Sequence, residues 1–538
     1  MVYFTHEEYV GVSAYLNKPD ASSDRNANML AVGALIRVEG ERMGKGWLHV
    51  EGLKRLAGDV SGGGNGDGGE EGLQGYWEEF QEKDGERRDG AAESTDSLPH
   101  TKQANGNGNG QIDGTGYRET RSMSTGSAFT PGQHTLAPHH PARNLMEMVS
   151  VFGPLIFPVY RAALLRKRIL LITEAPVEFA CDVVYNLSVL SSLAHAAASL
   201  VPRGDQRRTK ALFNVGVQDI DMLSRLEEGW IACSTDDVLA TKPELFDLAV
   251  FMPNTESKNA ERKVWPKIVE SSQDLSKQFP KVGVRASQRD AVRYEGLTEG
   301  LTQYPANEVA KDQGEEEGGD DEQQDSAQSS RAPSIHEHKE VVEPASWSQV
   351  AYTSLLWWAS AGDRRNGLSE EEEEQLEKDN MLLDSGDEGG RTKEVVVVSY
   401  FRRLTAMMFQ VVDDVLRQEQ NEDEAVEDGE ERHDGSSDEI QDQAKVNSKP
   451  TDGRVPEHEV EHHHQPSIDE GEARPLVKHK SRDEGVVIDL TPEDVAAMGL
   501  DVWSQADRKF AEELVEVWWG RKARVRRGGV ECCGVRIL

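Results

Sequence analysis

The chain has few cysteines and no long apolar run. Only 4 of its 538 residues are cysteine, too few for a disulfide framework, and Cys181 and Cys233 lie in apolar segments where free thiols are commonly buried. The longest weakly polar run, 187–201, is too short to cross a bilayer, and the first residues lack the basic and apolar regions of a signal peptide. We therefore expect a cytoplasmic protein in a reducing compartment, without a transmembrane segment.

Apolar residues are scarce as well. They make up 37% of the chain, against roughly 45–50% in an average domain, so much of the chain cannot be buried. Two segments, 307–344 and 419–484, carry more than half of the net charge of −37. Such segments stay hydrated because they offer little apolar surface to offset the entropy of ordering. The acidic balance argues against nucleic acid as a partner.

Signatures of catalysis and metal binding are absent or fall in unsuitable surroundings. Residues 458–462 match the zincin pattern HExxH, but flanking prolines and an acidic tail predict a solvated His-rich tract, with adventitious metal binding at 462–464 left open. The glycines at 64–69 satisfy GxGxxG without a preceding strand, and those at 40–46 miss the P-loop spacing by one residue. Neither GxSxG nor a paired CxxC occurs. We predict no cofactor, no metal and no intrinsic active site.

Two ordered parts flank an insertion rich in Gly, Asn and Ser. This insertion, 58–141, has the composition of a flexible, disordered linker. In the first part, 1–57, the run 28–36 is typical of a buried strand. Four apolar residues then recur at helical spacing: Trp47, Val50, Leu53 and Leu56.

In the second part, 142–305, strands alternate with helices. The run 168–173 favours a short strand. Five apolar residues after Pro176 share one helical face: Phe179, Val183, Leu187, Leu190 and Ala194. Compact apolar runs bounded by Gly, Asp and Pro, as strands are, follow at 211–217, 229–233 and 245–252. The alternation indicates an α/β layer structure, within an α+β chain overall.

The remainder of the chain is mainly helical and acidic. After an acidic disordered linker at 306–344, we expect a helical part at 345–418, which consists of two helices, 347–362 and 394–417, split by the acidic run 370–374. An acidic disordered tail is then expected at 419–484.

The last segment, 485–538, contains signals for one more helix. Ser504 can cap it with Asp507 three residues on, and Gly520 suits its end. Its apolar stripe consists of Phe510, Leu514, Val517 and Trp518. Because a disordered tail has no use for such a stripe, we expect this helix to pack back on the core.

Two basic runs are candidate contact surfaces. Arg166, Lys167 and Arg168 open the first strong strand of the second part, and either contact phosphate or an acidic partner loop or are solvated strand ends. The second run consists of Arg521, Lys522, Arg524, Arg526 and Arg527, followed by Cys532 and Cys533. Basic residues on anionic lipid and acylated cysteines would together give a peripheral membrane contact; the alternative is a basic face beside a helix with ordinary thiols.

Several stretches resemble the DENN proteins of the LCHN type. The sequence FGPLIFPVYRAALLRKRILLI at 152–172 is similar to the opening of their core lobe. It is followed in order by LFNVGVQDIDML at 212–223, GWIACSTDD at 229–237 and KPELFD at 242–247. GLDVWS at 499–504, WWG at 518–520 and ECCGVRI at 531–537 resemble a C-terminal domain of unknown function that accompanies this core in some relatives.

The resemblance implies a bilobed protein, with an N-terminal longin-like lobe and a C-terminal α/β lobe. Family members begin with further strands before the part that resembles 2–9, so the first lobe is expected to be truncated here. The family includes guanine-nucleotide exchange factors for Rab GTPases, which need no cofactor and act through a protein surface. The resemblance thus implies a regulator of vesicle traffic that binds a Rab GTPase, peripheral on an endomembrane; the alternative is a non-catalytic adaptor on an organelle surface.

Overall fold

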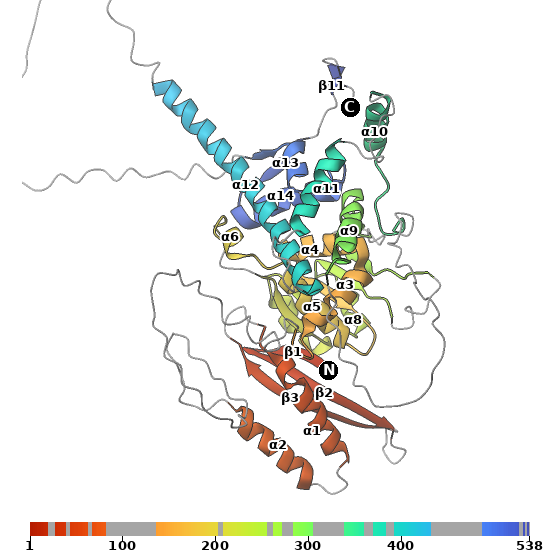
Figure 1. Ribbon diagram of the computed structural model, residues 1–538. Coiled ribbons are helices and arrows are strands. Elements are labelled where there is room, and N and C mark those ends of the chain that lie inside the picture. Colours follow the sequence, from red (N-terminus) through yellow and green to blue (C-terminus); the bar gives the residue numbers. More distant parts are fainter. Residues whose placement is uncertain are drawn as a thin grey trace, which may run out of the picture.

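The computed structural model describes fourteen stretches of the chain: residues 1–19, 27–38, 43–62, 67–81, 136–202, 208–254, 262–271, 283–304, 338–359, 370–383, 392–431, 487–526, 531–532 and 535–536. An eight-stranded mixed sheet runs through the protein, and helices pack against it (Figure 1). The α/β class predicted from the alternating apolar runs is therefore confirmed.

The strands follow the order β3-β2-β1-β5-β6-β4-β7-β8. Strands β5, β6, β4 and β7 are parallel, whereas β1–β3 and β8 join antiparallel at the two ends. Their bounds are β1 (Val2–His6), β2 (Tyr9–Pro19), β3 (Ala27–Arg37), β4 (Ile169–Ile172), β5 (Lys210–Asn214), β6 (Trp230–Ser234), β7 (Leu248–Phe251) and β8 (Lys267–Glu270). The strands of both predicted lobes thus share one sheet, joined where Phe4 of β1 pairs with Phe213 of β5.

The parallel strands are buried on both faces, which explains why they appear as continuous apolar runs. In β4, Ile169 and Leu171 point into one apolar cluster and Leu170 and Ile172 into the other. Strand β6 repeats the alternation, because Cys233 belongs to the first cluster and Ala232 to the second. The strands predicted at 168–173, 229–233 and 245–252 are confirmed, the last of them over Leu248–Phe251. The strand predicted at 211–217 extends only from Lys210 to Asn214, and a 3-10 turn begins at Val217.

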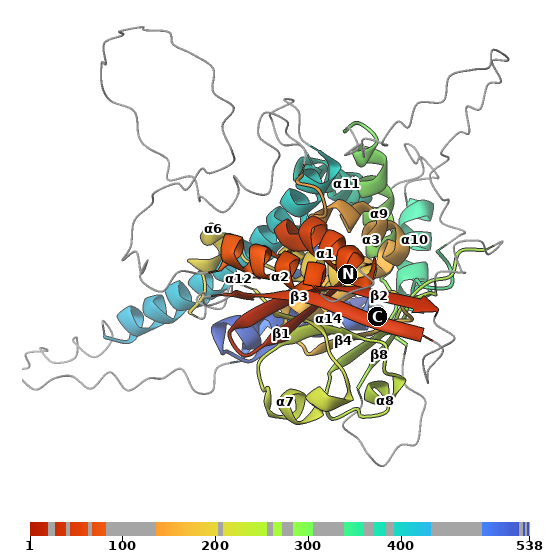
Figure 2. The same ribbon diagram turned by 90° about the horizontal axis from the view of Figure 1, so that it is seen from below.

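Helices cover the two faces unequally. Of the described helices, α7 (Ile220–Arg225) and α8 (Asp237–Ala240) contribute to the second cluster, together with the loop residues Leu245 and Phe246, and both helices lie on one side of the sheet in Figure 2. The first cluster takes side chains from α1 (Val50–Gly62), α3 (Leu145–Phe152), α4 (Ile156–Leu164), α5 (Glu178–Leu190), α6 (His195–Ala198), α9 (Gln288–Leu301), α11 (Glu370–Leu383), α12 (Lys393–Glu431), α13 (Pro492–Ala497) and α14 (Gln505–Trp519). Short 3-10 turns are η1 (Gly46–His49), η2 (Pro141–Asn144), η3 (Gly153–Leu155) and η4 (Val217–Asp219).

Strand β3 forms one edge of the sheet, and the expectation that 28–36 is buried is wrong. Its alternate residues Val32 and Ile36 face α1, but Met29 and Leu35 on the opposite face are 50% and 54% exposed. An edge strand covered by a helix on one face buries only every second side chain. The helical spacing of Trp47, Val50, Leu53 and Leu56 is confirmed in η1 and α1, and all four are buried.

Three helical segments fall where the sequence predicted other structure. Helix α2 (Asp67–Phe80) lies inside the insertion predicted to be a flexible linker, where Tyr76 and Phe80 pack on the His49 ring. The acidic run 370–374 opens α11 instead of interrupting the helical part, and α12 continues to Glu431. Tertiary contacts outweigh the poor helix propensity of glycine in α2. Acidic side chains are favourable in the first turn of a helix such as α11.

The returning C-terminal helix is confirmed. Ser504 caps α14 by accepting the N–H of Asp507, and Gly520 ends it in the left-handed conformation at φ 70°. The Trp518 indole donates to the carbonyl of Leu164 in α4 at 3.2 Å. Two small sheets accompany the helix, β9 (Ile488–Leu490) with β10 (Ala523–Val525), and β11 (Glu531–Cys532) with β12 (Val535–Arg536). The remaining helix, α10 (Trp347–Ala359), falls within the predicted range 347–362.

Within the part of the chain that the structure describes, two helical stretches are long and apolar enough to span a membrane, Pro141–Leu164 and Lys393–Asn421. Their apolar side chains, such as Phe157, Phe401 and Phe409, are fully buried in the first cluster. Their hydropathy is therefore that of core helices.

Candidate partner-binding site

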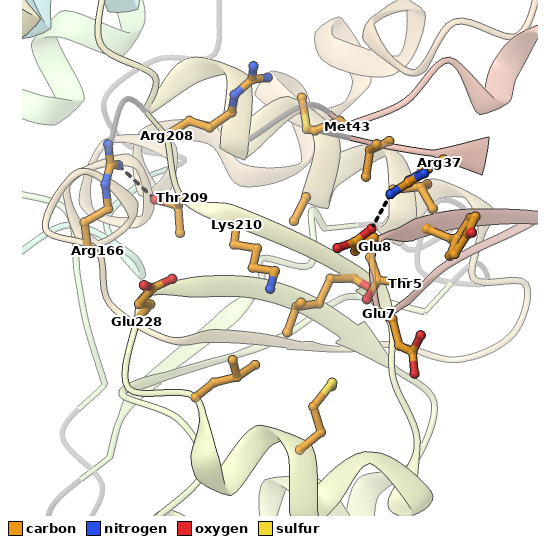
Figure 3. A pocket seen from close by; sticks show the side chains of 18 residues that line it. Thr5, Glu7, Glu8, Arg37, Met43, Arg166, Arg208, Thr209, Lys210 and Glu228 are labelled. Atoms are coloured by element: carbon orange, nitrogen blue, oxygen red, sulfur yellow. Dashed lines mark hydrogen bonds and ion pairs between the residues drawn. The ribbon is translucent and has the colours of Figure 1, made fainter. Parts of the chain in front are cut away.

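A cavity of about 690 Å³ opens where the N-terminal strands meet the parallel strands. Its walls come from the β1–β2 turn, the end of β3, the residues that lead into β5 and β6, and α7 (Figure 3). The polar lining consists of Thr5, Glu7, Glu8, Arg37, Arg166, Arg208, Thr209, Lys210 and Glu228, and Met43, Leu212, Met222 and Leu226 are among its apolar residues. The lining thus combines apolar side chains with charges of both signs.

Unusual backbone geometry gathers at this cavity. Among the described residues, four that are not glycine have positive φ: Glu7, His139, Arg166 and Phe213. Glu7 and Arg166 line the cavity, and Phe213 directly follows the lining residue Leu212. A positive φ is unfavourable for a side chain with a Cβ atom and is held only by surrounding contacts. Such residues are more frequent at functional sites than elsewhere.

Gly229 shows how closely the cavity wall is packed. A Cβ atom at this position would lie 2.0 Å from the carbonyl oxygen of Arg166. Only glycine allows the segment that enters β6 to approach the segment that enters β4 so closely. Arg166 is fixed further by its guanidinium, which donates to the Thr209 hydroxyl at 3.0 Å and to the carbonyl of Ser191 at 3.3 Å.

Charged groups line the cavity without filling it. Arg37 forms an ion pair with Glu8 at 3.1 Å. Lys210 extends into the middle of the cavity, with Glu228 on one side and Glu7 on the other (Figure 3). Four of the lining residues, Arg37, Arg166, Arg208 and Lys210, are basic. Their positive charges suit an acidic partner group.

The basic run at the start of β4 has partners within the chain. The Arg166 guanidinium lies 4.6 Å from the Trp518 ring, and Lys167 pairs with Glu513 at 2.9 Å, so both contact α14. Arg168 pairs with Asp247 at 2.8 Å. Only Arg166 of the three lines the cavity. Contact of these residues with another protein stays a prediction.

The basic run near the C-terminus lies beside β10. Arg524 and Arg526 are 3.5 Å and 3.0 Å from Asp489, but both remain largely exposed. Arg521 lies 3.8 Å from Glu419, and the carbonyl of Lys522 accepts the N–H of Ile488. Cys532 belongs to β11, and Arg527 and Cys533 lie outside the described residues. Membrane contact or acylation at this run stays a prediction.

Other candidate chemistry is not brought together by the described residues. Within them no group of three His, Cys, Asp or Glu side chains could hold a metal. The HExxH tract, the histidines at 462–464, Gly64, Gly66 and Gly40 lie outside them. The Cys181 and Cys233 sulfurs are 3.7 Å apart in the core, and this contact together with burial raises the pKa of the Cys233 thiol. A thiol kept protonated in this way is a poor nucleophile.

Sequence reasoning missed most of the cavity. Thr5, Lys210 and Glu228 come from separate strand ends that only the β1–β5–β6 pairing brings together. One local signal was present: two acidic residues, Glu7 and Glu8, separate the alternating runs of β1 and β2, which is the loop length of a tight hairpin.

Comparison with known proteins gives two family matches. Residues 1–262 match the family model described as DENN domain-containing protein 11. Residues 342–538 match a domain of unknown function, DUF4484. No solved structure gives a significant match.

Curated relatives are similar over part of the chain. DENN domain-containing protein 11 of Rattus norvegicus is 31% identical over 138 residues, which cover 26% of this chain and 29% of the relative. Uncharacterized protein C119.16c of Schizosaccharomyces pombe is 31% identical over 154 residues, 28% and 31% of the two chains. Uncharacterized protein ANR2 of Saccharomyces cerevisiae is 24% identical over 220 residues, 39% and 35%. The matched segments thus span about a third of each relative.

Proposed function

Because the chain belongs to the DENN domain-containing protein 11 family over residues 1–262 and carries DUF4484 over 342–538, we propose that it is a DENN-type regulator of membrane traffic that binds a Rab GTPase. The proposed activity is nucleotide exchange, with the cavity between β1–β3 and the parallel strands as part of the GTPase surface. The protein would act in the cytoplasm, peripherally on an endomembrane.

The observation that supports the proposal is the position of the cavity. It is lined jointly by the β1–β2 turn and by the entries to β5 and β6, and it concentrates strained backbone at Glu7 and Arg166. A preformed concave surface that combines apolar side chains with a few charges is typical of a binding site. Aromatic, arginine and methionine side chains are frequent in protein interfaces, and the lining contains Tyr9, Arg37, Met43 and Met222.

Exchange would require only differential binding. A partner that binds the nucleotide-free GTPase more tightly than the GDP-bound form shifts the equilibrium toward nucleotide release by the difference in affinity. The switch loops of a GTPase are ordered by the nucleotide phosphates, so a protein that holds them in another arrangement weakens nucleotide binding. Side chains at a surface suffice for this step, and the described residues offer Lys210 and Arg208 for acidic switch residues.

The test is release of fluorescent GDP from a panel of Rab proteins in the presence of the full chain. We expect accelerated release for at least one member, and charge reversal in Lys210→Glu to reduce the acceleration by about tenfold or more, since a like charge at an interface costs over a kcal/mol. The matched control is Lys267→Glu, which makes the same change at an exposed position on β8 at the far end of the sheet.

The outcomes separate the alternatives. If a Rab binds but its GDP release is not accelerated, the protein is a Rab-binding regulator without exchange activity. If no Rab binds at all, the proposal fails and the adaptor alternative takes its place. Recruitment to anionic vesicles that is lost in an Arg524→Glu/Arg526→Glu variant would support peripheral membrane attachment, because each basic residue near an anionic surface contributes about 1 kcal/mol.

A further inference from the structure

The region matched by DUF4484 shares one apolar core with the DENN region. Helix α12 contributes Val396, Phe401 and Phe409, none of them accessible to solvent, to the same cluster as Phe157 and Leu187 of α4 and α5. The Tyr160 hydroxyl of α4 lies 2.5 Å from the Thr405 hydroxyl of α12. Without the C-terminal region, the apolar faces of α4 and α5 would be exposed to water.

One buried arginine links the two regions electrostatically. Arg161 of α4 donates to both carboxylate oxygens of Asp290 in α9, at 2.7 Å and 2.6 Å, and lies 3.0 Å from a carboxylate oxygen of Asp507 in α14. All three side chains are almost fully buried. A buried carboxylate is unfavourable unless it is paired, so Asp507 depends on Arg161.

Both aspartates also stand in the first turn of a helix. Asp290 accepts the N–H of Ser287, the N-cap of α9, at 3.1 Å. The Asp507 carboxylate accepts the N–H of Asp501 at 2.9 Å, and its own N–H donates to Ser504, the N-cap of α14. The contacts at each helix N-terminus thus hold the carboxylate in position beside Arg161. The pairing fixes the position of α14 relative to α9.

The second link reaches the cavity. Trp518 of α14 donates to Leu164 in α4 and lies under the guanidinium of Arg166, which donates in turn to Thr209. Arg166 and Thr209 both line the cavity. Helix α14 therefore supports one wall of the cavity from behind.

We propose that the C-terminal domain of unknown function is an intramolecular clamp, which forms one cooperative folding unit with the DENN region through Arg161–Asp507 and holds the cavity wall through Trp518 and Arg166. The clamp is a function for DUF4484 that does not depend on which GTPase, if any, is the partner.

Hydrogen exchange of the full chain, followed by mass spectrometry of its peptides, tests the proposal. The variant is Asp507→Asn, which keeps the size of the side chain and removes its charge. We expect exchange to accelerate by about tenfold or more in α14 and equally in α4, α9 and residues 208–212, because amides in one cooperative unit exchange through one opening. The matched control is Glu516→Gln, the same change on the solvent face of α14, which should leave exchange unaltered.

Two results would overturn the proposal. Acceleration confined to 487–526, with α4 and α9 still protected, would make DUF4484 an independent module. Unchanged exchange everywhere would show that Arg161 does not hold α14. If Asp507→Asn does not accumulate as folded protein, exchange of the unaltered chain in increasing urea decides the question: one common opening of α4 and α14 supports the clamp, and two separate openings refute it. No GTPase enters this measurement, so its failure and that of the proposed function are distinguishable.

Discussion

Asp182 in α5 is a buried carboxyl group that accepts a hydrogen bond from the side-chain amide of Asn144 at 2.6 Å. Burial raises its pKa to about 7 in spite of that hydrogen bond. In the unfolded chain it would titrate near its usual value of about 3.9. The folded state therefore binds protons more tightly, and stability should fall as the pH rises from about 4 to about 7.

The prediction concerns Asp182→Asn, which keeps the shape and the acceptor oxygen for Asn144. At about pH 8 this variant should be more stable than the unaltered chain by roughly 2 to 4 kcal/mol, and the difference should shrink toward about pH 5, where Asp182 is protonated. Urea unfolding at the two pH values measures both quantities. An equal difference at both pH values would show that Asp182 does not titrate in this window.

Lys167 and Glu513 offer a second test at the level of single residues. Their ion pair of 2.9 Å is partly exposed, and Glu513 is shared with Lys509 at 3.3 Å. A double-mutant cycle of Lys167→Met and Glu513→Gln should give a coupling of about 0.5 kcal/mol that weakens in high salt. The corresponding cycle with Lys509→Met serves as the comparison within the same helix. Zero coupling in low salt would leave Lys167 available to another protein.

At the scale of elements, β3 has one edge that pairs with β2 and one that no described residue covers. The N–H of Val38, just after β3, donates to the backbone carbonyl of Glu8, just before β2. Because the direction of the backbone groups alternates along a strand, even-numbered residues of β3 bond to β2 and the N–H of Ala31 points to the open edge. A proline is tolerated on an edge strand where its missing N–H faces outward.

The expected result is a contrast between neighbouring positions. Ala31→Pro should change the free energy of unfolding by less than about 1 kcal/mol, whereas Val32→Pro, which removes a bond to β2, should cost about 3 kcal/mol or more. Urea unfolding of the two variants provides the comparison. Equal losses would mean that the open edge of β3 is covered in solution.

Elements that depend on local signals could be predicted, and those that depend on distant contacts could not. The cap at Ser504 and the stripe that ends at Trp518 are local, and the helix was placed correctly. Helix α2 has four glycines among its fourteen residues and is held by packing on His49, which no local pattern reveals. The candidate cavity could not be predicted from the sequence for the same reason, because Gly229 and Arg166 are adjacent only once β4 and β6 have paired.

At the scale of the whole molecule, the net charge of −37 opposes compaction. Added salt screens this repulsion, so the temperature of unfolding should rise by a few degrees between about 20 mM and about 300 mM NaCl. Replacing the acidic residues between 308 and 325 by their amides should raise the unfolding temperature in low salt. It should also make the unfolding temperature less dependent on the salt concentration. Differential scanning calorimetry gives both midpoints. A dependence as steep as before would place the repulsion elsewhere in the chain.

Arg161 neutralises one carboxylate in each of two helices, and this constrains how the sequence can change over evolution. A substitution at Arg161, Asp290 or Asp507 alone leaves a buried charge without its counterpart. A substitution at one of these positions is therefore tolerated only with certain residues at the other two. This is epistasis between residues up to 346 positions apart. Homologous sequences that lack the aspartate at the start of α14 should also lack the arginine of α4, and such covariation would record that the two domains have evolved as one.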